Sequence, residues 1–221
     1  LEQFVMIGES DKYRVSDGIL YEAVKDSEGT VLGYNLVKCP QAKAGTVVIP
    51  NDVLQINNRA FYQDNLITEV QFPTSLAEGI ELVFKPYSFY YCDGITNLVL
   101  PKGTVQIDKY AFYSCKGVES VTIPNTVELI YAQAFNNLTA LETVTFEEGN
   151  VGTELVLEDG SAYSDSYGTS EQYGIFYNSL KITEISLPER TKKIGKYAFA
   201  NMNITSIVIP STIEEISDYA F

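Results

Sequence analysis

The sequence repeats itself, and the repeat is the feature that most constrains its fold. Six short apolar stretches each end in proline: VVIP at Pro50, VQFP at Pro73, LVLP at Pro101, VTIP at Pro124, ISLP at Pro188 and IVIP at Pro210. The first four prolines are separated by 23, 28 and 23 residues, and the last two by 22. LETVTFEE adds a copy in which Glu147 takes the place of proline, and a fainter copy, LEQFVMI, opens the chain. Such a period predicts a solenoid of stacked coils.

The residues before the proline position predict a β-strand with one buried face. Positions one and three residues before it are apolar in every copy. The first of these columns contains Met6, Ile49, Phe72, Leu100, Ile123, Phe146, Leu187 and Ile209. Positions two apart lie on the same face of a strand. The positions two and four residues before the proline position point to the opposite face. The position four residues before it is polar in every copy, so we expect that face to meet solvent.

A second motif, Ile-x-x-x-Ala-Phe, follows the proline. Its Ala-Phe pairs occur at residues 60–61, 111–112, 134–135, 198–199 and 220–221. We interpret this motif as the return leg of each coil, in which the small Ala allows close backbone approach and the Phe fills the space between the two legs. Neighbouring coils should stack at roughly 4.8 Å, so like residues form ladders.

The combined pattern, L-x-x-V-x-I-P-x-x-V-x-x-I-x-x-x-A-F, resembles the BspA-like leucine-rich repeat family of bacterial surface proteins, over nearly the whole chain. The resemblance implies one β-rich domain over residues 1–221: a right-handed leucine-rich repeat solenoid of ~22–23-residue coils, with short strands and irregular or 3-10 return legs. It also implies a secreted or cell-surface protein that adheres to host proteins or other cells. No binding motif of the family maps onto this sequence.

Three insertions interrupt the array. Residues 8–43 contain Asp17-Gly18 and Ser27-Glu28-Gly29 between short alternating runs, which predicts a hairpin-type, strand-rich excursion. The stretch before Phe89 runs five residues longer than its counterparts, and the insertion at 148–175 is larger. Because the two later insertions occupy the same segment of the coil, we expect both to emerge along one side of the solenoid.

The acidic, Tyr/Gly/Ser-rich insertion at 148–175 is the candidate binding site. Its candidate partner-binding residues are Glu158, Asp159, Tyr163, Asp165, Tyr167, Glu171 and Tyr173. Tyrosine gives a large contact area at low entropic cost, although acidic Gly/Ser-rich insertions are more often solvated loops. Glu158, Asp159 and Asp165 offer oxygen ligands for calcium, but the ordered EF-hand spacing is missing. We therefore assign no metal site.

Charge and composition restrict the partners. The net charge is −14 and the pI is about 4.4, with no basic cluster, so nucleic acid and anionic membranes are poor partners. No apolar run approaches the ~20 residues that cross a bilayer. Cys39, Cys92 and Cys115 have no metal-type spacing. Cys92 and Cys115 lie 23 residues apart and should stack in adjacent coils, where buried free thiols or a disulfide would fit, the thiols being favoured.

The sequence favours a binding module over an enzyme. It contains no His and no nucleotide-binding or nucleophile motif, so we expect neither catalysis nor a cofactor. We expect an extracellular protein or glycan as the partner. The alternatives are a structural spacer that presents another domain and, more distantly, a carboxylate-dependent hydrolase. The apolar repeat stops in mid-coil at Phe221, which suggests a fragment of a longer protein, its signal peptide removed, or end-to-end self-association.

Overall fold

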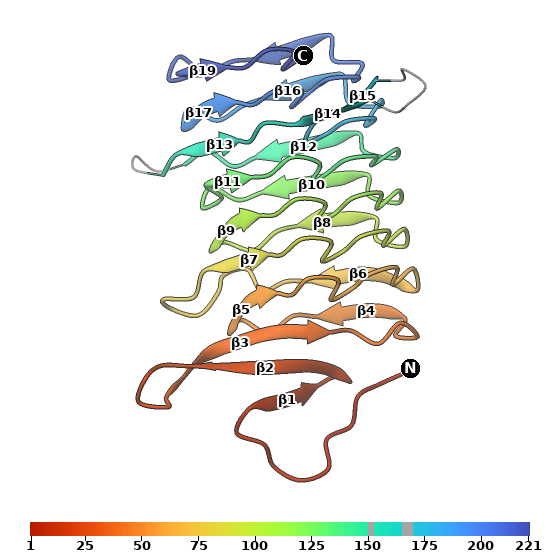
Figure 1. Ribbon diagram of the computed structural model, residues 1–221, viewed down its shortest axis with the longest axis vertical. Helices are drawn as coiled ribbons and strands as arrows, with labels where there is room; N and C mark the ends of the chain where they lie inside the picture. The colour runs from red at the N-terminus through yellow and green to blue at the C-terminus, as the bar shows by residue number, and fades with distance from the viewer. Residues whose placement is uncertain (150–152, 165–169) are drawn as a thin grey trace.

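The computed structural model describes residues 1–149, 153–164 and 170–221. The chain winds into a tall solenoid of stacked coils, with the N-terminal segment at one end and the C-terminus at the other (Figure 1). The described residues contain strands and turns but no helix. The predicted β-rich solenoid of stacked coils is therefore confirmed.

One wall of the solenoid is a ten-stranded sheet. In spatial order its strands are β1 (Tyr13–Ser16), β2 (Ile19–Lys25), β3 (Val31–Lys38), β5 (Val53–Ile56), β7 (Leu82–Phe84), β9 (Thr104–Ile107), β11 (Leu129–Ile130), β13 (Leu155–Leu157), β17 (Thr191–Ile194) and β19 (Glu215–Ile216). The pairs β1–β2 and β2–β3 are antiparallel, whereas every pair from β3 onward is parallel. Strands β5 and β9 end at Ile56 and Ile107, the residues with which the Ile-x-x-x-Ala-Phe motif begins. The first part of each of these return legs is therefore a short strand of this sheet. Their Ala-Phe parts form turns.

The opposite wall carries the strands that precede the proline position. They form three separate groups: β4 (Gly45–Val48) with β6 (Ile67–Gln71); β8 (Asn97–Val99) with β10 (Ser120–Ile123) and β12 (Thr143–Phe146); and β16 (Glu184–Ser186) with β18 (Ser206–Val208). Within each group the strands are parallel and equivalent residues pair. Val121, for example, lies opposite Leu98 on one side and Val144 on the other. All three side chains are buried, as the alternating pattern predicted.

The N-terminal insertion contains the two expected turns. Asp17 and Gly18 join β1 to β2 with φ values of 50° and 73°, the left-handed backbone that a two-residue hairpin turn needs. The second turn, at residues 26–30, joins β2 to β3. The β1–β3 segment continues the ten-stranded sheet beyond the first regular coil (Figure 1).

A stack of phenylalanine rings runs through the space between the two walls. Seven Phe residues of the return legs succeed one another with ring centroids 4.3 to 5.9 Å apart: Phe61, Phe89, Phe112, Phe135, Phe176, Phe199 and Phe221. The alanines at 60, 111, 134 and 198 are fully buried. Cys92 and Cys115 are buried free thiols that donate to the carbonyl oxygens of Phe61 and Phe89, so the expectation of unpaired cysteines is confirmed.

Candidate functional site

The insertion at 148–175 is divided into two parts by strand β13. Strand β13 follows residues 147–149 and 153–154, and a hairpin of β14 (Ser161–Ser164) and β15 (Ser170–Tyr173) follows β13. The hairpin leaves the solenoid on the side opposite to the loop between β6 and β7 (Figure 1). The expectation that the two later insertions emerge along one side is therefore wrong for the hairpin, and residues 150–152 of the insertion lie outside the described residues. The sequence signal that we missed is Leu155-Val156-Leu157, a regular coil strand inside the insertion.

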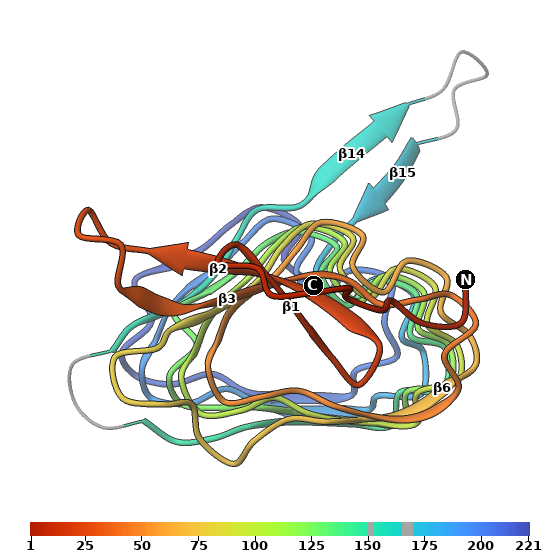
Figure 2. The same cartoon turned by 90° about the horizontal axis from the view of Figure 1, so that it is seen from below.

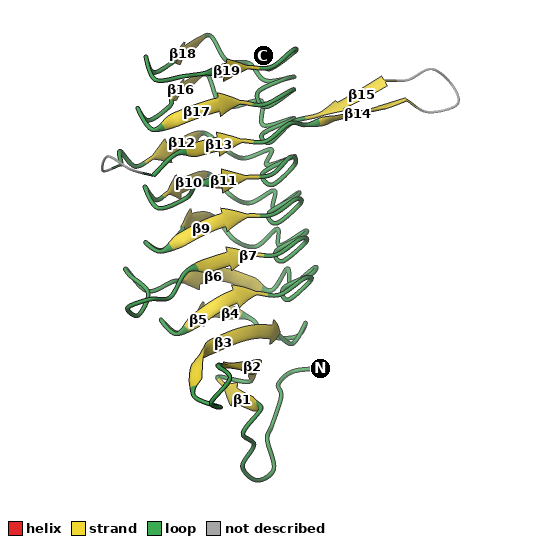
Figure 3. Cartoon of the chain, turned by 60° about the vertical axis from the view of Figure 1, so that its left-hand side comes forward, coloured by secondary structure: helices red, strands yellow, loops and turns green. Residues whose placement is uncertain are grey.

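The hairpin projects away from the body, from the edge that also carries the Ala-Phe turns (Figures 2 and 3). Among the described strands, β14 and β15 pair only with each other. Gly174, where the chain rejoins the body, has no room for a side chain, because an added Cβ would lie 1.5 Å from the Tyr197 carbonyl oxygen. The hairpin is thus joined tightly to the turn edge at its base.

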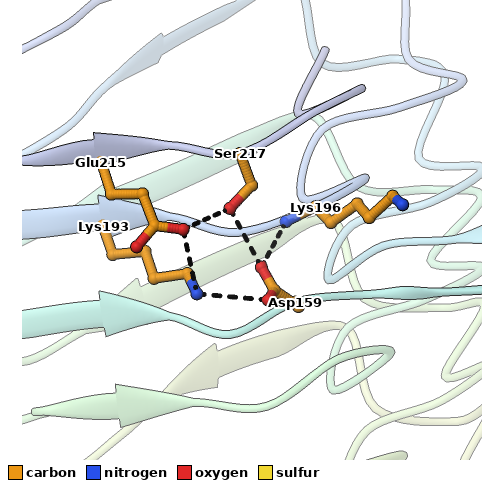
Figure 4. A network of polar contacts seen from close by, with 5 residues as sticks. All are labelled: Asp159, Lys193, Lys196, Glu215 and Ser217. Atoms are coloured by element: carbon orange, nitrogen blue, oxygen red, sulfur yellow. Dashed lines mark hydrogen bonds and ion pairs between the residues drawn. The ribbon is translucent and has the colours of Figure 1, made fainter.

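Asp159 anchors that base through three contacts. Its carboxylate accepts hydrogen bonds from the Lys196 backbone N–H at 2.8 Å and the Ser217 hydroxyl at 3.1 Å, and it pairs with Lys193 Nζ at 3.2 Å (Figure 4). Lys193 also pairs with Glu215 at 3.3 Å. The Lys196 N–H, followed by Lys193 and Ser217, lowers the pKa of Asp159. Asp159 therefore fixes the hairpin to the next two coils, and its charge is already satisfied within the chain.

The other candidate residues of the insertion have different positions. Glu158 lies beside Asp159 at the base and is half-buried. Tyr163 and Glu171 are directly opposite each other across the hairpin. The ring of Tyr173 contacts that of Tyr177 edge-on at 5.5 Å. Asp165 and Tyr167 lie outside the described residues. In the described part of the chain, no group of three or more acidic or cysteine side chains could hold a metal ion.

A second feature of the turn edge, not predicted from the sequence, is a cluster of tyrosine side chains. The tyrosine cluster consists of six half-buried residues: Tyr62, Tyr87, Tyr90, Tyr91, Tyr110 and Tyr113. They come from three successive coils and flank the buried phenylalanines in sequence. Tyr90 stacks between Tyr62, at 5.3 Å, and Tyr113, at 4.9 Å, and Tyr87 stacks on Tyr110 at 4.9 Å. The 23-residue spacing of Tyr87 from Tyr110 and of Tyr90 from Tyr113 was the signal that could have revealed it.

The backbone of the turn directs these side chains outward. Tyr87, Tyr91 and Tyr110 have φ values of 61°, 59° and 62°, in the left-handed region. Arg59 and Gln133, which occupy the position of Tyr87 in other coils, have φ values of 56° and 62°. Because the conformation recurs whatever the side chain, it belongs to the turn of the repeat, and the site is made by the choice of tyrosine there.

Basic side chains border the tyrosine cluster. The Arg59 guanidinium lies 5.7 Å from the Tyr62 ring and 5.4 Å from the Tyr87 ring. Lys109 lies 5.0 Å from the Tyr110 ring, and Lys116 lies 5.9 Å from the Tyr91 ring. These cation–π contacts place positive charge on one edge of a chain whose net charge is −14.

Tyr90 lies at the centre of the cluster and remains a neutral phenol. Burial among the neighbouring rings raises its pKa, and Tyr91, Tyr113 and Tyr62 add to the shift. A protonated hydroxyl both donates and accepts hydrogen bonds. The cluster therefore offers ring edges and hydroxyl groups for contact, together with cations at its border.

The family comparison decides which repeat this is. A model of the BspA-type leucine-rich repeat region matches six copies over residues 38–150 and 169–221. The chain belongs to the BspA-type leucine-rich repeat family. No curated protein matches the sequence. Within the described residues, no helix has the length and apolar character needed to cross a membrane.

Solved structures of bacterial proteins share the fold. The Treponema pallidum leucine-rich repeat protein is 15% identical with a TM-score of 0.61, covering 91% of this chain and 87% of its own. A leucine-rich repeat protein from Eubacterium ventriosum is 20% identical with a TM-score of 0.57, covering all of this chain and 52% of its own. The pneumococcal vaccine antigen PcpA is 14% identical with a TM-score of 0.52, covering 96% of this chain and 52% of its own. The BspA-type chain thus spans about half the length of two of these proteins.

Proposed function

We propose that the chain is a non-enzymatic protein-binding module of a bacterial cell-surface protein, and that its turn edge makes the contact. The observation that carries the proposal is the stacked tyrosine cluster. Rings held by their neighbours lose little conformational freedom when a partner binds, and tyrosine supplies both apolar area and a hydrogen-bonding hydroxyl. The hairpin β14–β15, on the same edge, extends the available surface.

The stacking favours a protein over a glycan as the partner. A sugar that packs on an aromatic side chain needs an open ring face, but the ring of Tyr90 is stacked on both sides. Arg59 lies over the ring of Tyr62, at the end of the same stack. The border of Arg59, Lys109 and Lys116 complements an acidic patch on the partner. The edge therefore supports a contact through ring edges, hydroxyls and cations.

Two alternatives receive less support. A spacer that binds nothing does not need tyrosines at six half-buried turn positions. A carboxylate-dependent hydrolase needs a carboxyl group that has a raised pKa and that substrate can reach. Burial raises the pKa of Asp64 to about 6, but this side chain is 0% exposed, so substrate does not reach it.

The test measures binding of the purified chain to panels of extracellular matrix proteins and of glycans. The disrupting variant carries Tyr87→Ser and Tyr110→Ser, which remove one stacked pair. The matched control is Tyr219→Ser. Tyr219 occupies the same position in the last coil, is 64% exposed and stacks on Tyr197, outside the cluster.

We expect the intact chain to bind a protein of the panel, the double variant to bind at least about tenfold more weakly, and Tyr219→Ser to bind normally. A third variant replaces residues 161–173 with a short Gly-Ser link, and it should fold because β14 and β15 pair only with each other. Its binding separates the contribution of the hairpin from that of the cluster. Binding to glycans alone would reject the proposed partner class, and an intact chain that binds nothing would favour the spacer.

A further inference from the structure

The wall that carries β4, β6 and β8 is interrupted between β6 and β8. Strand β6 pairs only with β4, and β8 pairs only with β10. A cleft of about 810 Å³ opens at this break, in the size range of ligand pockets, about 300–1,000 Å³. Among the residues that line it are Val70, Phe72, Asn97 and Val99.

A ladder hydrogen bond found in other coils is missing here. The residue directly before the proline donates its N–H to the following coil at Ile49→Gln71 O (2.9 Å), Leu100→Thr122 O (3.1 Å) and Leu187→Val208 O (3.2 Å). The equivalent bond, from the Phe72 N–H to the Val99 carbonyl oxygen, does not form, although this stretch is fully described.

Strand alternation identifies the backbone groups left open. Gln71 directs its carbonyl toward β4, and Leu100 directs its N–H toward β10. Alternate residues of a parallel strand direct their polar groups to opposite sides. The N–H groups of Val70, Phe72 and Val99, and the carbonyls of Val70, Asn97 and Val99, therefore face the cleft. Two strand edges with unpaired donors and acceptors line one opening.

Phe72 gives a physical reason for the break. Its column holds Ile or Leu in most coils, and Phe only at positions 72 and 146 among the copies with a strand. Phe72 packs edge-on against Phe84, with centroids 5.6 Å apart, and Phe146 packs edge-on against Phe176 at 6.5 Å. The wall is interrupted after each of them, between β6 and β8 and between β12 and β16. A bulky ring at the end of the strand thus accompanies each separation of coils.

We propose that the cleft between β6 and β8 binds an extended polypeptide segment, which adds as a strand to the open edges. Added strands gain affinity from main-chain hydrogen bonds and specificity from alternate side chains. Inward side chains of the segment meet Val70, Phe72 and Leu100 and are apolar. Outward side chains lie among Gln71, Asn97 and solvent and are polar. The occupant is an extended peptide with alternating apolar and polar residues, and its binding is independent of the tyrosine cluster.

The test selects a phage-displayed library of linear peptides on the intact chain and measures the affinity of the enriched peptides, synthesised free, by calorimetry. The disrupting variant is Val99→Pro. It removes an N–H that faces the cleft while leaving the Leu100 bond to β10, and proline is tolerated at an unpaired strand edge. The matched control is Val48→Pro, at the equivalent position of β4, where Val48 is 56% exposed and outside the cleft.

We expect enriched peptides with alternating patterns that bind Val99→Pro at least about tenfold more weakly and bind Val48→Pro normally. A second variant, Phe72→Leu, gives this position the leucine that other coils have at Leu100 and Leu187. Because the smaller side chain lets β6 and β8 approach each other, this variant should also abolish binding. If Val99→Pro fails to fold, Phe72→Leu decides alone. A library that yields no binding peptide, or enriched peptides that bind both variants as they bind the intact chain, would overturn the proposal.

Discussion

Phe112 and Phe135 lie face to face in adjacent coils, with ring centroids 5.3 Å apart and planes within 2° of parallel. Their separation is close to the spacing of strands in a sheet, roughly 4.8 Å. Each ring is therefore covered by the coil on either side of it. A single coil cannot bury its phenylalanine by itself, so the stack makes the stability of one coil depend on its neighbours.

We predict that Phe135→Ala destabilises the chain by about 3–5 kcal/mol, because it removes a fully buried ring that touches both Phe112 and Phe176. Phe135→Leu, which keeps most of the volume, should cost clearly less. Phe221→Ala is the control for a ring of the same stack that is 53% exposed. Urea denaturation measures all three. A loss of stability at Phe135 no greater than that at Phe221 would contradict the role of the stack.

Asp64 predicts an unusual dependence of stability on pH. It is fully buried, and neither of its carboxylate oxygens has a hydrogen-bond partner. Burial raises its pKa to about 6, and Lys38 and the Cys39 thiol only partly oppose the shift. Since the unfolded chain has a pKa of about 3.9, the folded state favours the protonated acid. The free energy of unfolding is therefore highest, as far as this group is concerned, below pH ~4, where Asp64 is protonated in both states. It falls as the pH rises through about 6.

Asp64→Asn should therefore be more stable than the intact chain at pH 7, by about 2 kcal/mol, and this advantage should shrink toward pH 4. The measurement is the free energy of unfolding of both proteins from pH 4 to 7. Asp218→Asn, at an exposed carboxylate, controls for the loss of one negative charge. A difference between Asp64→Asn and the intact chain that stays constant with pH would show that Asp64 does not titrate in this way.

Arg190 joins coils that lie far apart in sequence. It is 8% exposed, and its guanidinium donates to the carbonyl oxygens of Val127 and Pro124, the latter at 3.2 Å. Arg190→Met keeps the apolar length but leaves the Val127 carbonyl unpaired, whereas the Pro124 carbonyl still accepts the Val127 N–H. We predict that this change lowers the free energy of unfolding by about 1–3 kcal/mol. Arg190→Lys should recover part of the loss through one hydrogen bond. Thermal and urea unfolding would contradict this role if Arg190→Met were as stable as the intact chain.

The regular part of the fold could be predicted from the sequence because its contacts repeat. The apolar columns, the Ala-Phe turns and the equivalent positions of Cys92 and Cys115 all depend on residues about 23 positions apart, and each copy repeats the same evidence. The Asp17-Gly18 turn was likewise predictable, because a two-residue hairpin is a local structure. The candidate site was predicted less well. Asp159 proved to be an anchor of the hairpin base, and the tyrosine cluster was missed because its residues lie outside the buried columns.

The sequence by itself determined the period, the buried face of each strand and the succession of phenylalanines, because these follow from patterns within and between equivalent coils. Only the tertiary structure decided that the hairpin leaves from the turn edge, that the tyrosines cover one another's faces and that the wall opens after Phe72. The reason is physical. Periodicity states which residues share a position in the coil, whereas the separation of neighbouring coils depends on how side chains of different size pack between them.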